Sequence, residues 1–492
     1  MRLASKFFWF ALAILSGVEL LSLLAFDSPL AETAATVVAT AAVLLAATYH
    51  LRWGVYAILT ELFIGGKGYL LTLPLPSGRL SIRMILFIVV WGVWLGKFLT
   101  SRERHRHLPR KVTLLPTMLG AAMLAALLLG LARYPFGDVF FDANGWAFFL
   151  MAPVVFLTIK THRDVQRVIQ LLGAAVTVEA VKTGVLVYLF GHVNAALLEP
   201  TYRWIRDTGV GEVTYISGTL FRVFFQSHLY ALVAWLTLLT ILVSRRLQSK
   251  GDVLLATAVM YLASLTVIIS QSRSFWIGGM AGFCFLLWIA HNRFGVPLGR
   301  TLLVAFLLVL IVQSQRSVVA LISGNFRGGA FASRWVSLQD EPASSSRLSQ
   351  LKPLISAIQQ HPWLGSGYGR SVTYQSQDPR VVSGHPGGWY TTTAFEWGYL
   401  DMALKIGLPG LAFYLAWVAS VMRQGLAAHP PPDGGNHLRL AAVVSLTGVL
   451  VTNIFSPYLN HPLGIGWVLF AVAAVYAVNS AADPKREPIN AG

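Results

Sequence analysis

Charged side chains are scarce in this sequence of 492 residues. Asp, Glu, Lys and Arg make up 12% of the chain and hydrophobic residues 55%, whereas a soluble domain carries roughly 25% charged residues. This composition excludes a water-soluble globule of this size, and it excludes disordered and collagen-like chains. A single cysteine, Cys284, excludes an intrachain disulfide framework.

Several motifs of soluble enzymes are also missing. The chain has no P-loop, no dinucleotide-binding glycine fingerprint and no Gly-x-Ser-x-Gly nucleophile turn. Asp138 and Asp142 are four residues apart and could share a helix face, but such a pair is weak evidence for a metal. His105 and His107 lie in a basic stretch and are expected to be solvated. We therefore expect neither a cofactor nor a resident metal.

Long apolar runs recur along the whole chain. A run of about 20 apolar residues can cross a bilayer as a helix. We therefore expect an all-α polytopic membrane protein with about fourteen transmembrane helices. The expected spans are 6–26, 31–48, 54–73, 82–99, 113–132, 141–159, 168–190, 219–243, 252–270, 274–291, 301–319, 400–422, 440–457 and 464–480.

The distribution of Lys and Arg orients these spans. With the N-terminus in the cytoplasm, most of the formal charge of +17 falls on the cytoplasmic side, as the positive-inside rule requires. Both termini are then cytoplasmic. The charge is interpreted as a topology signal, and nucleic-acid binding is not expected. The basic cytoplasmic segments are 102–111, 160–167, 245–250, 293–300, 423–439 and 485–486.

One long exoplasmic loop interrupts the short connections. It divides the chain into spans one to eleven (1–316), the loop itself (317–395), and spans twelve to fourteen with a cytoplasmic tail (396–492). Loops of this length are usually functional. Residues 345–360 place Leu348, Leu351, Leu354, Ile355 and Ile358 on one helical face. We expect this amphipathic helix to lie along the membrane surface and to end at His361-Pro362.

Several arginines are expected at the same exoplasmic face. Arg222 lies at the start of the eighth span, and Arg273 lies in the tight turn between spans nine and ten. The long loop adds Arg347, Arg370 and Arg380. Guanidinium groups bind phosphate oxygens in pairs and stay charged at any working pH, which suits a diphosphate. The alternative for each arginine is snorkelling toward lipid headgroups.

Other charges lie within the predicted spans. Glu61 and Lys67 flank the glycines of the 65–68 segment, which predicts a broken helix. Lys67 is a candidate for an anion site, although a structural Glu61–Lys67 pair is the preferred interpretation. Glu179 and Lys182 are three residues apart and are expected to form an internal pair. Glu19 has no evident local partner.

Glu396 follows the long loop at the exoplasmic mouth of span twelve. A carboxylate there could act as a general base if partial burial raises its pKa. The alternative is an acid that stabilises a helix N-terminus. Asp401 and Lys405 are spaced i, i+4 in the favourable order for an ion pair.

An ordered set of motifs resembles the O-antigen ligase and polymerase superfamily. His361-Pro-Trp-Leu-Gly365-Ser-Gly367-Tyr-Gly369 resembles that family's HPLLGVGPG segment, and Leu404-Lys405-Ile-Gly407-Leu-Pro-Gly410-Leu resembles its AELGLIGLL span. Ser272-Arg273-Ser-Phe-Trp276 is similar to its SRGAW turn and Ser346-Arg347-Leu348 to its SGRL helix start. Arg222 corresponds to the family's first periplasmic arginine. The resemblance covers roughly residues 200–480.

The resemblance implies a metal-independent membrane glycosyltransferase of the GT-C class in the bacterial inner membrane. Such enzymes pass a glycan from undecaprenyl diphosphate to an acceptor hydroxyl at the periplasmic face, here with inversion. Arg222, Arg273, Arg347 and Lys67 are then the candidate diphosphate ligands. Further substrate-binding candidates are Gln226, His228, Tyr368 and Arg370.

The sequence departs from the family at one position. Ligases carry His-Asn eleven residues before the glycine that corresponds to Gly407, where this chain has Glu396-Trp397. Glutamate can accept a proton as histidine does. The difference favours a repeat-unit polymerase of exopolysaccharide or O-antigen over a ligase. His385 and His361 are alternative bases, and His361 is better explained as the end of the helix.

Three further functions stay open at this stage. They are ligation of the glycan to lipid A core or protein, a peptidoglycan-type polymerase, and a transporter or lipid flippase. A transporter places its site near the midplane between repeats, whereas the polar candidates here gather at one face. The expected partners are the lipid-linked donor, a glycan acceptor, membrane lipid, and a chain-length regulator or flippase.

Overall fold

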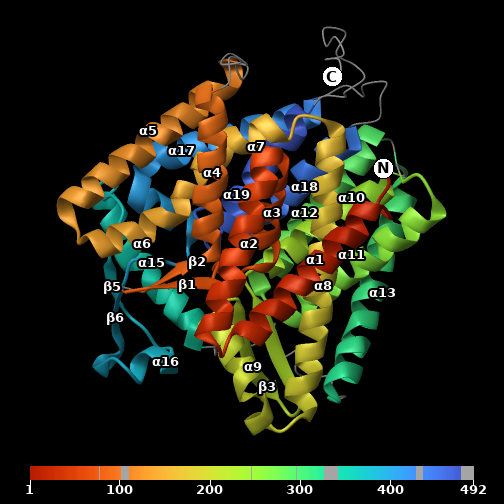
Figure 1. Cartoon of the computed structure of the whole chain (residues 1–492), viewed down its shortest axis with the longest axis horizontal. Coiled ribbons are helices and arrows are strands. Elements are labelled where there is room, and N and C mark those ends of the chain that lie inside the picture. Colours follow the sequence, from red (N-terminus) through yellow and green to blue (C-terminus); the bar gives the residue numbers. More distant parts are fainter. Residues whose placement is uncertain are drawn as a thin grey trace.

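The structure, a computed structural model, describes residues 1–76, 78–100, 110–244, 247–294, 296–325, 342–427 and 436–477. The predicted basic segments lie partly outside the described residues, at 102–109, 245–246, 428–435 and 485–486. Helices dominate the architecture, and the strands form three short antiparallel hairpins (Figure 1). The all-α polytopic class is therefore confirmed.

The first half of the chain contains α1 (Lys6–Ala25), α2 (Pro29–Tyr49), α3 (Leu51–Ile64), β1 (Thr72–Leu75), β2 (Gly78–Ser81), α4 (Ile82–Thr100), α5 (Arg110–Arg133), α6 (Phe136–Trp146), η1 (Ala147–Met151), α7 (Ala152–Thr158), α8 (His162–His192), α9 (Ala195–Asp207), β3 (Gly211–Ser217), β4 (Leu220–Phe225) and α10 (His228–Val243). The second half contains α11 (Lys250–Ser270), α12 (Arg273–Phe294), α13 (Leu298–Ser323), α15 (Pro342–Gln360), β5 (Val372–Gln375), α16 (Pro379–Val382), η2 (Pro386–Gly388), β6 (Trp389–Thr392), α17 (Gly398–Ala427), α18 (Asn436–Thr452) and α19 (Pro462–Tyr476).

Ten of the fourteen expected spans are confirmed as helices long and apolar enough to cross a membrane, counted over the described residues. The other four are shorter. Runs 440–457 and 464–480 correspond to α18 and α19, which have 17 and 15 residues. Run 219–243 contains the 16-residue α10, and run 54–73 contains the 14-residue α3.

Two of these runs change backbone conformation part-way. α3 ends at Ile64 because Gly66 and Gly68 adopt positive φ angles of 55° and 98°, so the predicted helix break is confirmed. Residues 220–225 form strand β4, which pairs with β3, and α10 begins only at His228. The expectation that Arg222 begins a helix was therefore wrong, since it lies on a hairpin.

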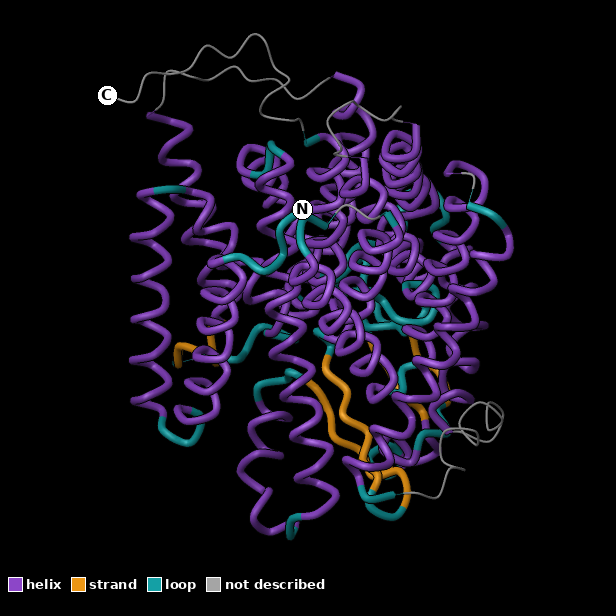
Figure 2. Tube along the Cα trace, turned by 90° about the vertical axis from the view of Figure 1, so that its right-hand side faces the viewer, coloured by secondary structure: helices purple, strands orange, loops and turns teal. Residues whose placement is uncertain are grey.

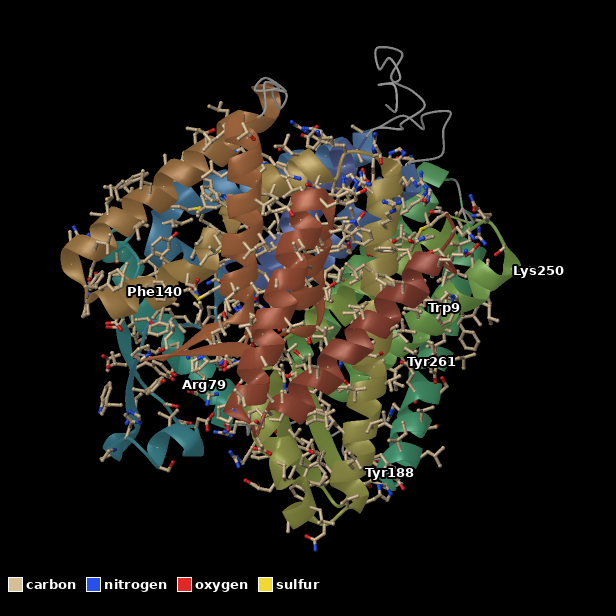
Figure 3. All side chains as sticks on the ribbon, viewed as in Figure 1. Trp9, Arg79, Phe140, Tyr188, Lys250 and Tyr261 are labelled. Atoms are coloured by element: carbon tan, nitrogen blue, oxygen red, sulfur yellow. The ribbon has the colours of Figure 1, made fainter. Side chains whose placement is uncertain are left out.

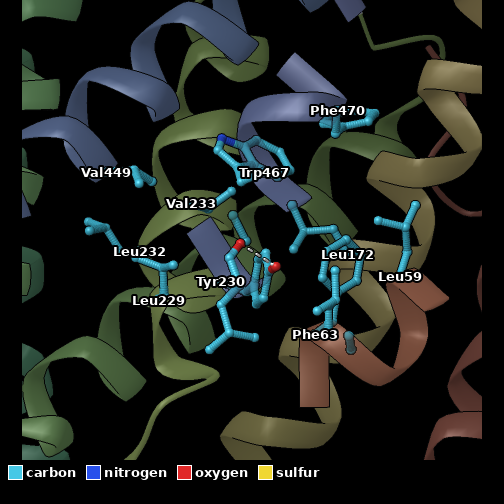
Figure 4. Close-up of a cluster of buried hydrophobic side chains, with 14 of the residues drawn as sticks. Leu59, Phe63, Leu172, Leu229, Tyr230, Leu232, Val233, Val449, Trp467 and Phe470 are labelled. Atoms are coloured by element: carbon cyan, nitrogen blue, oxygen red, sulfur yellow. Dashed lines mark hydrogen bonds between the residues drawn. The ribbon is translucent and has the colours of Figure 1, made fainter. Parts of the chain in front are cut away.

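The core lies where α3, α8, α10 and the two C-terminal helices meet (Figure 4). The rings of Phe63 and Tyr230 are 4.5 Å apart, and the Tyr230 hydroxyl donates to the Leu463 carbonyl oxygen at 2.7 Å. Buried tyrosine hydroxyls usually have such a partner. This bond therefore fixes the beginning of α19 against α10.

A buried ion cluster joins α1 to α8. Lys182 Nζ lies 2.9 Å from Glu179 Oε1, which confirms the predicted internal pair, and 2.6 Å from Glu19 Oε1. The partner of Glu19 was not visible in the sequence because it lies 163 residues away. Buried charges in apolar surroundings persist only when they are paired in this way.

The hairpins gather in the lower half of the view in Figure 2. β1–β2, β3–β4 and β5–β6 all lie there, together with α9 and α16 (Figure 1). Tyr188 and Lys250 lie toward opposite ends of the helical assembly, and Arg79 lies in the half with the hairpins (Figure 3).

The amphipathic helix of the long loop is observed as α15, which begins at Pro342 and ends at Gln360, before His361-Pro362, as predicted. Leu354 and Ile358 are buried in one cluster with Phe395, which precedes α17, and with Leu404 of α17. Leu348 and Ile355 stay exposed. The apolar face therefore docks partly on the protein, and its contact with a membrane surface stays a prediction.

The glycine-rich segment 361–369 docks against a break in α17. Gly407 has a non-helical φ of 73° and ψ of 169°. The freed backbone bonds to the segment, with Ser366 N donating to Leu404 O at 2.7 Å and Leu408 N donating to Pro362 O at 2.8 Å. Gly367, at a φ of 88°, packs so closely on α5 that a Cβ would lie 2.7 Å from Gly130 N.

We expect Gly367→Ala to lower the free energy of unfolding by about 2 kcal/mol, because a strained backbone and a steric clash are imposed together. Thermal unfolding in detergent measures this. The control is Gly384→Ala, since a Cβ there meets nothing closer than Val381 O at 3.9 Å. Equal melting temperatures for the two variants would contradict the proposed packing role.

Candidate functional site

A cavity of about 550 Å³ lies among α4, α6, the start of α17 and the segment before α19. Apolar residues such as Met84, Phe87 and Phe148 line it together with polar and charged side chains from distant parts of the chain. Such a combination is typical of a ligand site. The polar residues used below are Lys67, Arg83, Asp142, Gln226, Asp401, Asn460 and His461.

Two cations line the cavity, and only one of them is neutralised. Arg83 donates from Nε to Glu61 Oε2 at 2.7 Å and from Nη2 to Glu61 Oε1 at 3.0 Å. The expected Glu61–Lys67 pair was therefore wrong, because Arg83 of α4 takes the carboxylate. Lys67 is exposed and forms no ion pair with any residue that the structure describes. Its ammonium is available to an anion.

Two carboxylates face these cations, and a buried lysine lies between them. The Lys405 side chain has no exposed surface, and its Nζ is ion-paired with Asp142 Oδ2 and lies 4.0 Å from Asp401 Oδ1. It also donates to Thr393 O at 2.9 Å and Arg370 O at 3.3 Å. The expected Asp401–Lys405 contact is thus secondary to a contact with Asp142, which lies 263 residues away.

The segment before α19 supplies two further polar groups. Asn460 Nδ2 donates to Asp401 Oδ2 at 2.5 Å. His461 caps α19, with Leu463 N donating to its Nδ1 at 3.4 Å. Burial, together with the charges of Arg83 and Lys67, lowers the pKa of His461 to about 3. The imidazole is therefore neutral at physiological pH and accepts the capping bond.

Arg222 bonds to the backbone of Ser270, three residues before Arg273. Arg222 donates from Nε to the Ser270 carbonyl oxygen at 2.8 Å, and its guanidinium lies 4.8 Å from the Phe224 ring centroid. Arg273 begins α12, directly after the predicted tight turn, in which Gln271 adopts a φ of 47°. Gln226, four residues after Arg222, lines the cavity. The two arginines do not line it themselves.

The candidate base Glu396 lies at the edge of the site. Its carboxylate is ion-paired with Arg347 of α15, and both side chains are nearly half exposed. The neighbouring Trp397 Nε1 donates to Arg347 O at 2.9 Å. Phe395 and Ala394 line the cavity, whereas Glu396 and Arg347 do not. The structure thus brings Glu396 together with one of the predicted diphosphate ligands.

Four other predicted residues lie apart from the cavity. His385 is exposed, with its ring 5.2 Å from that of Tyr390. His228 is buried, 3.0 Å from Thr183 Oγ1. Tyr368 is buried against Trp146, and burial raises its pKa. Arg370 Nη2 lies 3.5 Å from Gln360 Oε1.

Sequence reasoning missed Arg83, Asn460 and His461, and it considered Asp142 only for a metal. Arg83 lies at the start of a span, where a cation is usually an anchor. Asn460 and His461 lie in a short connection without a motif. One signal was present: Asp142 is an acid inside a predicted span, and such charges mark functional sites by default.

We expect the protein to lose stability as pH falls from about 6.5 toward 3, because His461 protonates in the unfolded chain but not in the native site. The contribution of this group is on the order of 1 kcal/mol per pH unit. His461→Asn keeps a capping acceptor without titrating. Thermal unfolding at pH 7 and pH 5 should show a smaller loss for the variant; an equal loss would contradict this prediction.

The comparisons with known proteins concern the part of the chain that contains α12, α15 and the break in α17. Residues 257–415 match the sequence model of the family described as O-antigen ligase. No curated protein matches the chain. The matched residues include Arg273, Arg347, Glu396 and Lys405, and the match confirms the resemblance found in the motifs. The chain is therefore similar to the O-antigen ligase family over residues 257–415.

Proposed function

We propose that this protein is a bacterial inner-membrane glycosyltransferase that polymerises undecaprenyl-diphosphate-linked oligosaccharide repeat units. The reaction takes place at the periplasmic face, needs no metal, and inverts the anomeric carbon. The cavity supports this proposal best, because an unneutralised cation, Lys67, and two carboxylates surround a space large enough for sugar residues. In this proposal both termini are cytoplasmic.

The diphosphate of the donor binds between the cavity and α12 in this proposal. In this proposal Lys67, which lines the cavity, is joined at the diphosphate by Arg222, Arg273 and Arg347 from outside the cavity lining. Guanidinium and ammonium groups stabilise the negative charge that develops on the leaving diphosphate. The sugar then occupies the polar cavity, next to Gln226 and Asn460.

An apolar groove supports a lipid-linked donor. It has a volume of about 260 Å³ and lies between α11, α12 and α13. Phe275 and Trp276, two and three residues after Arg273, line the groove from α12, and Leu308 and Val312 line it from α13. A prenyl chain placed there has its diphosphate end close to Arg273.

Polymerisation is preferred over ligation because Glu396 stands where the family's ligases have histidine. The two activities differ in their products. Purified protein incubated with lipid-linked repeat units should yield a ladder of products, because each transfer regenerates an acceptor. A single transfer to lipid A core or protein would favour the ligase, and no transfer at all would overturn the proposed function.

We expect Arg273→Ala to abolish the ladder while the protein still inserts into the membrane. The physical reason is the loss of a charge that compensates the leaving diphosphate. Gel analysis of the products measures the effect, and Arg79→Ala is the control because Arg79 is an exposed residue of β2. A ladder of normal length from Arg273→Ala would contradict a diphosphate role.

We expect Val312→Trp to raise the KM for a long-chain lipid donor about tenfold, because the indole fills the apolar groove and costs about 1.4 kcal/mol of donor binding. A donor with a short, soluble chain should be turned over normally. Val309→Trp is the matched control, since Val309 lies on the same helix, is 56% exposed and lies outside the groove. If Val312→Trp raised the KM equally for the long-chain and the short-chain donor, the prenyl chain would not bind in this groove.

A further inference from the structure

Asp142 has the geometry of a positioned base. It lies on α6, outside the segment that matches the O-antigen ligase family. Its Oδ2 is ion-paired with Lys405 Nζ and also accepts a hydrogen bond from Gly369 N at 2.7 Å. Its Oδ1 accepts no hydrogen bond from the described residues. The side chain keeps 10% exposure and lines the cavity.

The two contacts on Oδ2 hold the carboxylate in one orientation. Lys405 is fully buried on α17, and Gly369 ends the glycine-rich segment that docks on the break of that helix. A carboxylate anchored through one oxygen presents the other to a ligand without losing side-chain entropy at the moment of reaction. Lys405 and Gly369 are therefore positioning residues for Asp142.

The other carboxylates of the site are engaged differently. Asp401 Oδ2 accepts from Asn460, and its Oδ1 is buried. Glu61 is bound by both nitrogens of the Arg83 fork. Glu396 is paired with Arg347 outside the cavity. Asp142 thus lines the cavity and has one oxygen that accepts no hydrogen bond within the described part of the chain.

We propose that Asp142 is the catalytic base that activates the acceptor hydroxyl. This inference rests on the proposed function and replaces Glu396 in that role, leaving Glu396 to hold Arg347. The acceptor oxygen forms a bond to the anomeric carbon of the donor, and its proton passes to Asp142 Oδ1. The bond from the anomeric carbon to the diphosphate oxygen breaks, and its electron pair leaves with the lipid diphosphate.

The Lys405 ammonium is the contact that stabilises the ionised form of Asp142, which accepts the proton in this proposal. Lys405 and Asp401 face it from α17 and Tyr368 from the glycine-rich segment, and Lys67, Arg83 and His461 line the same cavity. Lys405 stabilises the carboxylate, so its removal should move the acid limb of the turnover profile to higher pH. If Lys405 had only a structural role, its replacement would not change the pH at which turnover falls on the acid side of the profile.

The test compares Asp142→Asn with Asp142→Glu and with Asp138→Asn in the full-length protein. Asp138 is an exposed residue one turn earlier on the same helix. We expect Asp142→Asn to lower kcat at least 100-fold, the usual range for a lost general base, while Kd for the lipid-linked donor changes less than about threefold. Asp142→Glu should retain part of the turnover, and Asp138→Asn should behave as the wild type.

Two further measurements keep the outcome decisive. Lys405→Gln should shift the acid limb of kcat upward, which remains measurable even if Asp142→Asn fails to fold. Unchanged kcat in Asp142→Asn, a loss confined to donor binding, or an unshifted limb in Lys405→Gln would overturn the assignment. If Glu396→Gln loses turnover while Asp142→Asn keeps a normal kcat, Glu396 and not Asp142 is the catalytic base. A wild-type protein without transfer activity would overturn the proposed function and this inference together.

Discussion

The ammonium of Lys405 is the interaction on which the cavity wall depends. A lysine with no exposed surface is costly unless its charge is compensated and its three donors are satisfied. Here Asp142 compensates the charge, while the carbonyl oxygens of Arg370 and Thr393 take the remaining donors. One side chain thereby joins α6, α17 and both ends of the segment that carries β5 and β6. Removing it would leave an unpaired carboxylate facing the cavity, which is a larger penalty than the loss of one bond.

The two cations that line the cavity, Arg83 and Lys67, differ in their partners. Arg83 is fixed by Glu61 and by the Gly66 carbonyl oxygen, so it shapes the turn after α3. Lys67, on that same turn, has no acidic partner in the part of the chain that is described. The pairing of Arg83 thus positions the loop on which Lys67 is presented. An anion that enters the cavity can therefore pair with the ammonium of Lys67. The Arg83–Glu61 pair holds the turn that carries Lys67 in place.

Local patterns predicted what depends on neighbours in sequence. The spacing of Glu179 and Lys182, the glycine break after Glu61, and the helix ending at Gln360 all follow from residues a few positions apart. The partners of Glu19, Asp142 and Arg83 could not be predicted, because tertiary packing over 22 to 263 residues selects them. Strand β4 could not be predicted for another reason: a short run of six residues, all apolar except Arg222, fits a strand as well as a helix.

The break at Gly407 sets the depth at which the charges lie. An unbroken helix over the 30 residues of α17 would be about 45 Å long, well beyond the roughly 30 Å of a hydrocarbon core. Residues 408–427 alone are about 30 Å long, and they match that thickness. The nine residues before the break, which carry Asp401 and Lys405, are thereby displaced toward the polar boundary of the bilayer. The proposed function requires such a boundary, because there a water-soluble sugar and a lipid-soluble carrier would reach the same cavity.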